Sequence, residues 1–144
     1  EFAGEFQKIM RSRGKEFGAT TGRPRRCGWF DSLLVKEAVS INGISELALT
    51  KLDILDELKA IEVCVAYKYK GKLFKEFVPD PEVLKGARPV YRQIPGWQSP
   101  TAHISQYKRL PAKARSYISL LEALSGADIS MISVGSSRAE TIFV

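Results

Sequence analysis

The nine residues Gly18–Arg26 combine groups that could bind an anion. They include two glycines, two threonine hydroxyls and three arginines. Glycine lets the backbone approach a ligand closely, and Pro24 stiffens the stretch that carries the arginines. An arginine fork can bind a carboxylate or a phosphate through two parallel hydrogen bonds. The composition therefore indicates an anion-binding loop, with a merely solvated basic loop as the alternative.

A second candidate site is Lys51-Leu52-Asp53, which follows the apolar run Leu47–Leu49. A carboxylate can accept two hydrogen bonds from guanine, one from N1–H and one from the exocyclic amine, whereas adenine offers neither donor at that edge. The lysine stem can cover the base while its ammonium group stays in water. Open α/β sheets bind ligands just beyond the carboxyl ends of their strands. These residues predict a guanine-binding site, and an ordinary surface ion pair is the alternative.

Ser133-Val134-Gly135 ends a later apolar run in the same way, although many strands end in a Ser-x-Gly turn. No catalytic set accompanies these candidates. The single histidine, His103, lies in a loop rich in proline and serine without a nucleophile pattern, and we interpret it as a surface residue. The chain also lacks the Gly-x-x-x-x-Gly-Lys phosphate loop.

Periodicity predicts the elements that position these residues. We expect a helix over 3–13, a helix capped by Asp31 with Leu34, Ala38 and Ile41 on its buried face, and a strand at 47–49 buried on both faces. Strict alternation from Ile61 predicts a half-covered strand that turns at Lys70-Gly71 into a second strand over 72–78. Residues 79–102 are expected to be mostly loop, with a short strand at 90–94. We expect Asn42-Gly43 to end the second helix. A third helix follows Pro111, carries Ala114, Tyr117, Ile118, Leu121 and Leu124 on its apolar face and ends at Gly126, and a last strand spans 129–134.

Composition sets further limits. The chain has 144 residues, a net charge of +6 and 44% hydrophobic residues, which is typical of one globular domain with an anionic partner. Two cysteines without metal-ligand spacing favour a reducing compartment, and we expect a cytoplasmic location. No apolar run is long enough to span a membrane, so no membrane partner is expected.

The run Glu16–Asp31 closely resembles the adenylosuccinate synthetase family. Matching motifs continue in family order at 49–56, 63–67, 95–97 and 132–135. The resemblance implies a homodimeric ligase that joins IMP to L-aspartate with hydrolysis of GTP and with Mg²⁺, giving adenylosuccinate in AMP biosynthesis. It implies that the glycine and arginine loop binds L-aspartate, that Arg23 also reaches IMP, and that Arg25 lies near the GTP phosphates. The implied aspartate and IMP residues are Ala19, Thr20, Thr21, Gly22, Arg23 and Arg25, and the implied GTP residues are Arg25, Lys51, Leu52, Asp53, Ser133, Val134 and Gly135.

Departures from the family pattern shape the remaining expectations. The family's phosphate loop, with its catalytic aspartate and Mg²⁺ contacts, and its catalytic histidine have no counterpart in this sequence. Ser136-Ser137 stands where the family has proline and an acidic residue. We therefore expect residues 1–144 to be the C-terminal part of a mixed-sheet α/β nucleotide-binding fold of the P-loop-NTPase-like type, with a hairpin and about three helices. We expect the catalytic residues and Mg²⁺ ligands outside this chain, and no synthesis by the chain alone.

Two other functions compete with this interpretation. A free-standing basic module could bind a nucleotide or nucleic acid without catalysis, although no nucleic-acid motif is recognised and the charges are spread along the chain. A structural piece that folds but binds nothing is the third possibility.

Overall fold

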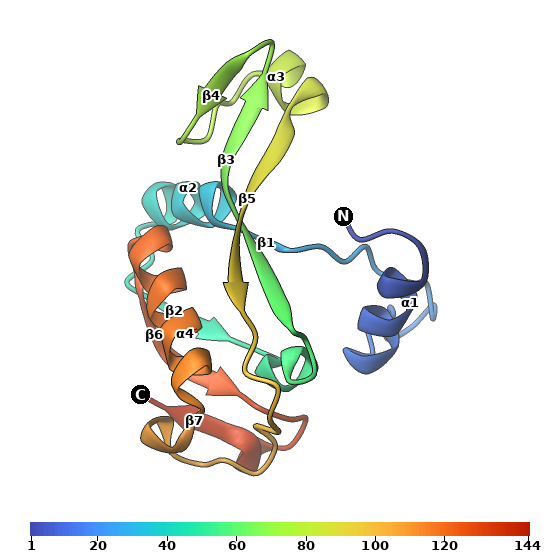
Figure 1. The fold of residues 1–144 in the computed structure, drawn as a ribbon, viewed down its shortest axis with the longest axis vertical. Helices are drawn as coiled ribbons and strands as arrows, with labels where there is room; N and C mark the ends of the chain where they lie inside the picture. The colour runs from blue at the N-terminus through green and yellow to red at the C-terminus, as the bar shows by residue number, and fades with distance from the viewer.

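Two β-sheets organise the computed structural model, which describes residues 1–144 (Figure 1). In the first sheet β3 is central; it pairs in parallel with β1 and antiparallel with β4 and β5. In the second sheet β6 is central; it pairs in parallel with β2 and antiparallel with β7. The mixed-sheet α/β class predicted from the sequence is confirmed. The strands are β1 (Phe30–Asp31), β2 (Glu46–Leu49), β3 (Ala60–Tyr69), β4 (Lys72–Phe74), β5 (Arg88–Pro95), β6 (Asp128–Ser133) and β7 (Thr141–Phe143).

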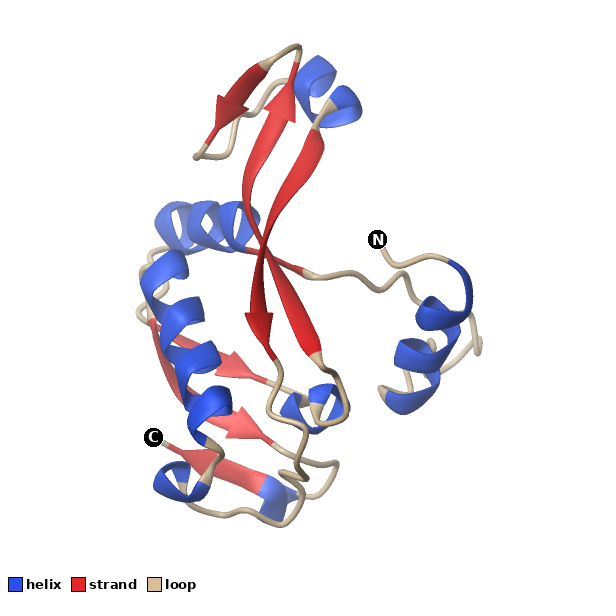
Figure 2. Cartoon of the chain, in the orientation of Figure 1, coloured by secondary structure: helices blue, strands red, loops and turns tan.

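Four α-helices and three short 3₁₀ helices join these strands, against the roughly three helices that we predict from the sequence (Figure 2). α2 and α4 pack against each other, and α4 also packs on β6. α1 lies apart from them, at the end of an extended segment (Figure 1). None of the helices is long and apolar enough to cross a lipid bilayer. The helices are α1 (Gly4–Arg13), α2 (Ser32–Asn42), α3 (Pro81–Gly86), α4 (Ala112–Ser125), η1 (Leu52–Leu55), η2 (Tyr107–Arg109) and η3 (Arg138–Glu140).

The predicted helix ends are confirmed. The Asp31 carboxylate caps α2 by accepting hydrogen bonds from the backbone N–H groups of Leu33 and Leu34. Gly43 and Gly126 end α2 and α4 in the left-handed conformation, with φ of 62° and 77°. Local sequence signals thus fix where these two helices begin and end.

The predicted buried face of α2 is wrong. Leu34 and Ile41 are 48% and 72% exposed, whereas Leu33 is buried at 3%. The first turn is tied to β3, because the Ser32 hydroxyl donates to the Cys64 carbonyl at 2.7 Å. That tie turns Leu33 toward the sheet and leaves the predicted face toward solvent.

Two strand predictions also need correction. β2 is not buried on both faces, because Glu46 and Ala48 on one face are exposed whereas Leu47 and Leu49 on the other are half-buried. In β3 the alternation breaks where the register with β5 shifts between Cys64 and Ala66. Cys64 is buried in a small cluster with Leu33 of α2 and Tyr67, and Val65 at the bulge is half-buried, so the side chains no longer alternate strictly.

The segment after the hairpin is more ordered than predicted. The second hairpin strand ends at Phe74 rather than at residue 78. Asp80 caps α3 through hydrogen bonds to its carboxylate from the backbone N–H groups of Glu82 and Val83. β5 is longer than the expected 90–94, since it pairs with β3 along most of its length. Tertiary pairing therefore orders a segment whose prolines indicate a loop.

The main core lies between α4 and the two sheets. It also receives Leu52 from η1 and Trp97 from the segment after β5. The predicted inner face of α4 is confirmed, because Ala114, Tyr117, Ile118 and Leu121 are buried. This core fixes the carboxyl ends of β2 and β6, where the candidate guanine residues lie. Its members are Leu52, Ile61, Val63, Trp97, Leu110, Ala114, Tyr117, Ile118, Leu121, Ile129, Ile132, Val134 and Ile142.

Candidate functional site

Four of the predicted guanine-binding residues line one cavity of about 330 Å³. They are Lys51, Asp53, Val134 and Gly135. β2 and β6 are parallel neighbours, with Leu49 opposite Ile132, so their carboxyl ends meet at one edge of the sheet. The cavity therefore lies where an open α/β sheet binds its ligand.

A direct hydrogen bond joins the two strand ends. The Lys51 backbone N–H donates to Ser133 Oγ at 2.9 Å, across 82 residues of sequence. Lys51 has a φ of 61°, a left-handed conformation that is uncommon for a residue with a side chain. The lysine is held in that conformation because Ser133 binds its N–H and the core binds the next residue, Leu52, which is 1% exposed. The Leu52 side chain faces the core rather than the cavity, so only its backbone can face a ligand.

Asp53 has an unusual environment. Its Oδ1 atom is buried and has no hydrogen-bond partner, alone among the buried side-chain oxygen and nitrogen atoms of the chain. Burial raises the pKa of Asp53 above its ordinary value, the carboxylates of Asp56 and Glu140 raise it further, and Lys51 opposes the rise. A buried carboxylate oxygen without a donor is costly. Two donors from a ligand would offset that cost.

Gly135 allows the backbone to approach the Glu140 carboxylate. A Cβ atom at this position would lie 2.2 Å from Glu140 Cδ, so a side chain cannot be accommodated without movement. Glu140 accepts a hydrogen bond from the Ser137 N–H at 2.9 Å, in a reciprocal cap that opens η3. This hydrogen bond from the backbone lowers the pKa of Glu140. The turn after β6 is thus closed by a carboxylate that also lines the cavity.

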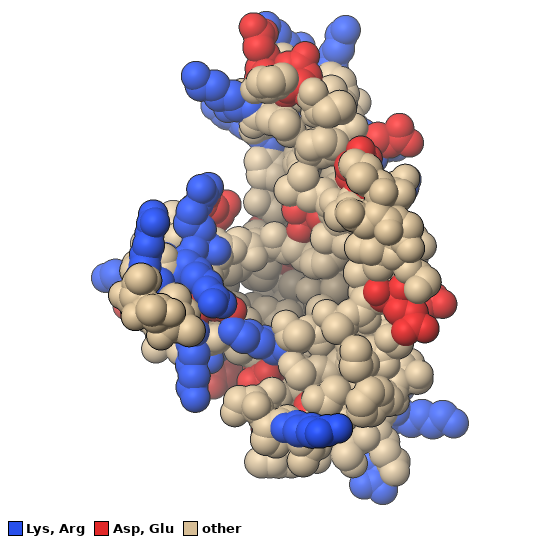
Figure 3. All heavy atoms as spheres, turned by 180° about the vertical axis from the view of Figure 1, so that it is seen from behind, with Lys and Arg blue, Asp and Glu red and all other residues tan.

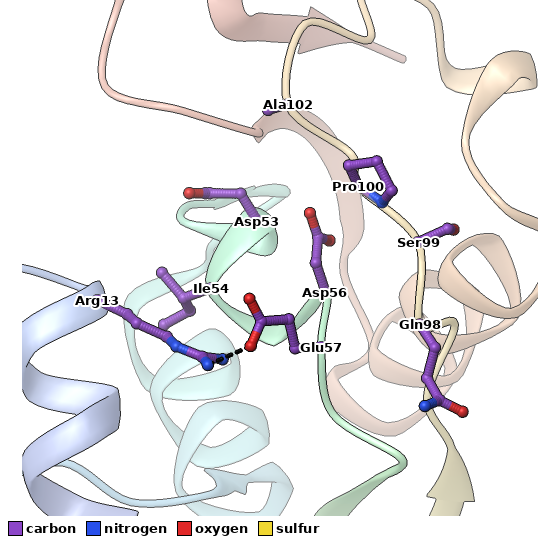
Figure 4. Close-up of a pocket in the computed structure, with 9 residues that line it drawn as sticks. All are labelled: Arg13, Asp53, Ile54, Asp56, Glu57, Gln98, Ser99, Pro100 and Ala102. Atoms are coloured by element: carbon purple, nitrogen blue, oxygen red, sulfur yellow. Dashed lines mark hydrogen bonds and ion pairs between the residues drawn. The ribbon is translucent and has the colours of Figure 1, made fainter.

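A larger cavity of about 650 Å³ adjoins the first and is also lined by Asp53 (Figure 4). Asp53, Asp56 and Glu57 come to it from the η1 segment, and the segment from Gln98 to Ala102 faces them (Figure 4). The exposed Glu57 carboxylate pairs with Arg13 of α1. Arg13, Asp53, Ile54 and Ala102 line both cavities.

The Asp56 carboxylate is fully engaged in structural hydrogen bonds. It accepts from Trp97 Nε1 at 2.6 Å, from the Thr101 N–H at 2.7 Å and from the Thr101 hydroxyl at 2.9 Å. Thr101 is 0% exposed and Trp97 is 7% exposed. Asp56 therefore fastens the segment after β5 to η1, the element that carries Asp53.

The arginine loop folds back on itself as a small closed loop. The Gly18 N–H donates to the Arg23 carbonyl at 2.8 Å, and the Arg25 N–H donates to the Glu16 carbonyl at 2.9 Å. Residues 19–26 are all exposed. Figure 3 shows Lys and Arg side chains gathered on this part of the chain, around α1. The loop thus exposes its arginines to solvent, and Arg25 and Arg26 pair with the carboxylates of Glu16 and Glu1.

Glu16 connects this loop to the guanine candidates. One carboxylate oxygen accepts from Arg25 at 3.0 Å, and the other accepts from the Lys51 ammonium group. Lys51 Nζ also donates to the Gly14 carbonyl at 2.5 Å. The hydrogen bond from Lys51 lowers the pKa of Glu16, and burial opposes this.

The predicted residues therefore fall into two places. The guanine candidates share one cavity, except for the side chains of Leu52 and Ser133. Residues 19–23 line neither of the two cavities beside Asp53, and Arg25 lines a separate cavity of about 400 Å³ beside Trp29. Sequence reasoning missed the roles of Glu16 and Glu140. The Ser-x-x-Glu spacing that ends at Glu140 is a capping signal that could have identified it.

The chain has no group of three or more His, Cys, Asp or Glu side chains that could hold a metal ion. The residues present thus do not fit a complete Mg²⁺ site, and we assign none of them to the metal.

Comparison with known proteins relates this geometry to a family. A family model described as adenylosuccinate synthetase matches residues 1–142. The adenylosuccinate synthetase of Endomicrobium trichonymphae is 48% identical over 144 residues, which is 100% of this chain and 34% of that protein. The enzyme of Geotalea uraniireducens is 47% identical over 135 residues, 94% of this chain and 31% of that protein.

A solved structure also resembles this chain. The fully ligated adenylosuccinate synthetase from Plasmodium falciparum matches with a TM-score of 0.93 and 34% identity, over 100% of this chain and 35% of that chain. The chain spans about a third of the length of these relatives. Sequence and fold agree along nearly its whole length, and the chain belongs to the adenylosuccinate synthetase family.

Proposed function

We propose that this chain acts as part of an adenylosuccinate synthetase, the ligase that joins IMP and L-aspartate with hydrolysis of GTP in AMP biosynthesis. Within it, Lys51, Asp53, Val134 and Gly135 bind the guanine of GTP, with Ser133 and the backbone of Leu52 completing that site. The observation that carries this proposal is the Asp53 carboxylate, which lines a cavity at the carboxyl ends of two parallel strands and whose Oδ1 has no hydrogen-bond partner in the protein.

The chemistry of guanine fits this oxygen. Its N1–H and exocyclic amine are adjacent donors, and an ionised carboxylate can accept both at once. Each hydrogen bond to a charged group contributes about 1.5–3 kcal/mol. Adenine lacks both donors at this edge, so an adenine nucleotide would leave the Asp53 carboxylate buried and unpaired. Guanine is therefore favoured because it satisfies a group that the free protein leaves unsatisfied.

The arginine loop is the proposed site for L-aspartate. Ala19, Thr20 and Thr21 supply backbone and hydroxyl donors, and Gly22 closes the loop by donating its N–H to the Gly18 carbonyl. The exposed guanidinium groups of Arg23 and Arg25 bind carboxylates. Arg23 also contacts IMP, and Arg25 lies toward the GTP phosphates. In the reaction, a phosphoryl group moves from GTP to the 6-oxygen of IMP and the aspartate amine then displaces it. Positive charge held beside the substrates offsets the negative charge that develops.

Other parts of the proposal follow from the family. We expect a cytoplasmic homodimer that uses Mg²⁺, with the metal held by residues other than those of this chain. We also expect the 144 residues alone to make no adenylosuccinate, because they supply no general acid–base pair. A spectrophotometric assay for adenylosuccinate with the purified chain tests this, and turnover would refute it.

Replacement of Asp53 by asparagine tests the guanine assignment. The asparagine amide can donate to the 2-oxo group of xanthine and accept from its N1–H, but it cannot accept both guanine donors. We expect Asp53→Asn to weaken GTP binding roughly 30-fold, or about 2 kcal/mol, and to strengthen binding of xanthosine triphosphate by a similar factor. Calorimetric titration of the purified protein with GTP, ATP and xanthosine triphosphate measures both changes.

Glu57→Gln is the matched control, since it also removes one negative charge from the same segment but lies outside the guanine cavity. The control should keep the wild-type preference for GTP. Equal affinity of the wild-type protein for GTP and ATP would refute the proposal, as would a D53N protein with unchanged selectivity.

The rival nucleic-acid function is tested in the same preparation. Four basic side chains of the N-terminal part already pair with carboxylates: Lys8, Arg13, Arg25 and Arg26. This pairing reduces the free positive charge that a nucleic acid would need. Binding to a duplex oligonucleotide that weakens steeply with salt would favour the rival function.

A further inference from the structure

Glu16 is the only side chain that contacts both the arginine loop and a guanine-cavity residue through ion pairs. One of its carboxylate oxygens binds Arg25 at 3.0 Å and the other binds the ammonium group of Lys51. Lys51 and Glu16 lie 35 residues apart in the sequence. The two oxygens of the Glu16 carboxylate thus connect the arginine loop, the proposed carboxylate site, to the proposed guanine cavity.

The geometry of Glu16 is more constrained than that of an ordinary surface ion pair. Its side chain is 23% exposed, and its partners Arg25 and Lys51 are 56% and 38% exposed, whereas the Glu5–Lys8 pair on α1 is more than 70% exposed at both partners. Its backbone N–H donates to the Arg11 carbonyl at 2.9 Å, and its carbonyl accepts from the Arg25 N–H at 2.9 Å. With both backbone groups held, the carboxylate has little freedom to leave its two cations. A half-buried pair in a fixed geometry is also screened less by solvent and salt than an exposed one.

Lys51 is equally constrained on the other side. Its N–H is bound by Ser133 and its ammonium group by Glu16 and the Gly14 carbonyl. The lysine stem therefore runs along the guanine cavity from one fixed end to another. A base that packs on this stem fixes the ammonium group further, and any shift of the ammonium group moves Glu16.

We propose that Glu16 is a positioning residue that couples the guanine cavity to the arginine loop, so that a guanine nucleotide and a dicarboxylate bind cooperatively. This inference rests on the function proposed above. A nucleotide base that orders Lys51 orders Glu16, and Glu16 then holds Arg25 at the loop in the orientation that binds a carboxylate. A dicarboxylate on the loop orders the same chain of contacts in reverse. Linkage requires the two effects to be equal, so each ligand must raise the affinity for the other by the same factor.

The test measures this factor in the purified protein. Calorimetric titrations give the affinity for GTP with and without saturating L-aspartate, and the affinity for L-aspartate with and without saturating GTP. In the wild-type protein we expect each ligand to raise the affinity for the other about tenfold. In Glu16→Gln the factor should fall to about one, since the amide keeps a single oxygen acceptor and turns an NH₂ donor toward one of the two cations. The affinity for GTP alone should change less than about threefold, because Glu16 does not contact the base.

Two further variants separate coupling from a structural effect. Glu57→Gln breaks the Arg13–Glu57 ion pair, which also joins the α1 region to the η1 segment but contacts neither Lys51 nor Arg25. In Glu57→Gln, each ligand should raise the affinity for the other by the same factor as in the wild-type protein. Glu16→Asp keeps the charge but is one methylene too short to reach both cations, so its factor should fall below about three. Glu16→Asp decides the question if circular dichroism shows that Glu16→Gln does not fold.

The outcomes distinguish this inference from the proposed function. An unchanged factor in the folded Glu16 variants overturns the coupling while GTP selectivity and aspartate binding stand. An equal loss in Glu57→Gln overturns it as well, since general loosening would then explain the effect. A wild-type protein that binds GTP no better than ATP overturns the proposed function, and the coupling with it.

Discussion

Removal of the Asp56 carboxylate should destabilise the fold and loosen the candidate site. Asp56→Ala leaves three donors without their acceptor: the indole N–H of Trp97, the backbone N–H of Thr101 and the hydroxyl of Thr101. Both residues are buried, at 7% and 0% exposure, so water cannot easily replace the lost oxygens. The loss should therefore appear in the free energy of unfolding.

The magnitude follows from the number of buried donors. Each unsatisfied buried donor costs about 1–3 kcal/mol, and Asp56 itself is only half-buried, which favours the lower end. Three donors at about 1 kcal/mol each give a loss of about 3 kcal/mol. For a chain of 144 residues this corresponds to a fall in Tm of roughly 10 °C.

Urea titration followed by tryptophan fluorescence measures this loss, and Trp97 is itself part of the perturbed contact. Glu57→Ala is the matched control, because the Glu57 side chain is 74% exposed and its ion pair with Arg13 should contribute less than about 1 kcal/mol. Asp56→Asn should lie between the two, since it keeps one oxygen acceptor. A loss below about 1 kcal/mol for Asp56→Ala would show that the donors find other partners, and the reasoning from buried hydrogen bonds would be refuted.

Four further predictions concern ionisation and local geometry. Because burial raises the pKa of Asp53 above 3.8, GTP affinity should fall as the pH is lowered from about 8 to about 4, and calorimetry of Asp53→Asn should show no such fall. The same raised pKa means that ionisation of Asp53 costs stability as the pH rises above 3.8, so Asp53→Asn should unfold at an equal or higher urea concentration at neutral pH. Gly135→Ala should displace Glu140 and weaken GTP binding at least about tenfold in the same titration, and an unchanged affinity would contradict the close approach. Asp31→Ala should lower the free energy of unfolding by about 2 kcal/mol, because it removes the α2 cap and the acceptor of the Tyr67 hydroxyl at 2.5 Å. Urea titration measures this loss, and a loss equal to that of Tyr67→Phe would mean that the cap contributes nothing.

Much of the fold could be predicted because its signals are local. An aspartate before a helix and a glycine after it satisfy backbone groups within a few residues, so the ends of α2 and α4 agree with prediction. The errors occur where distant segments decide burial. Leu34 and Ile41 have helical spacing, yet the tie between Ser32 and β3 sets which face of α2 is covered. β5 extends through a proline-rich segment because β3 supplies its hydrogen bonds.

The candidate site divides in the same way. Residue types and their spacing predict the chemistry of the site, since a lysine and an aspartate after a short apolar strand indicate a base-binding group and clustered arginines indicate an anion-binding group. Tertiary structure alone decided that Lys51 lies against Ser133, 82 residues away, and that Glu16 joins Lys51 to Arg25. It also decided that Asp53 keeps a buried oxygen without a partner. Residue types fix which hydrogen bonds and charges are available, whereas the pairing of β2 with β6 and the return of the arginine loop fix which of them meet.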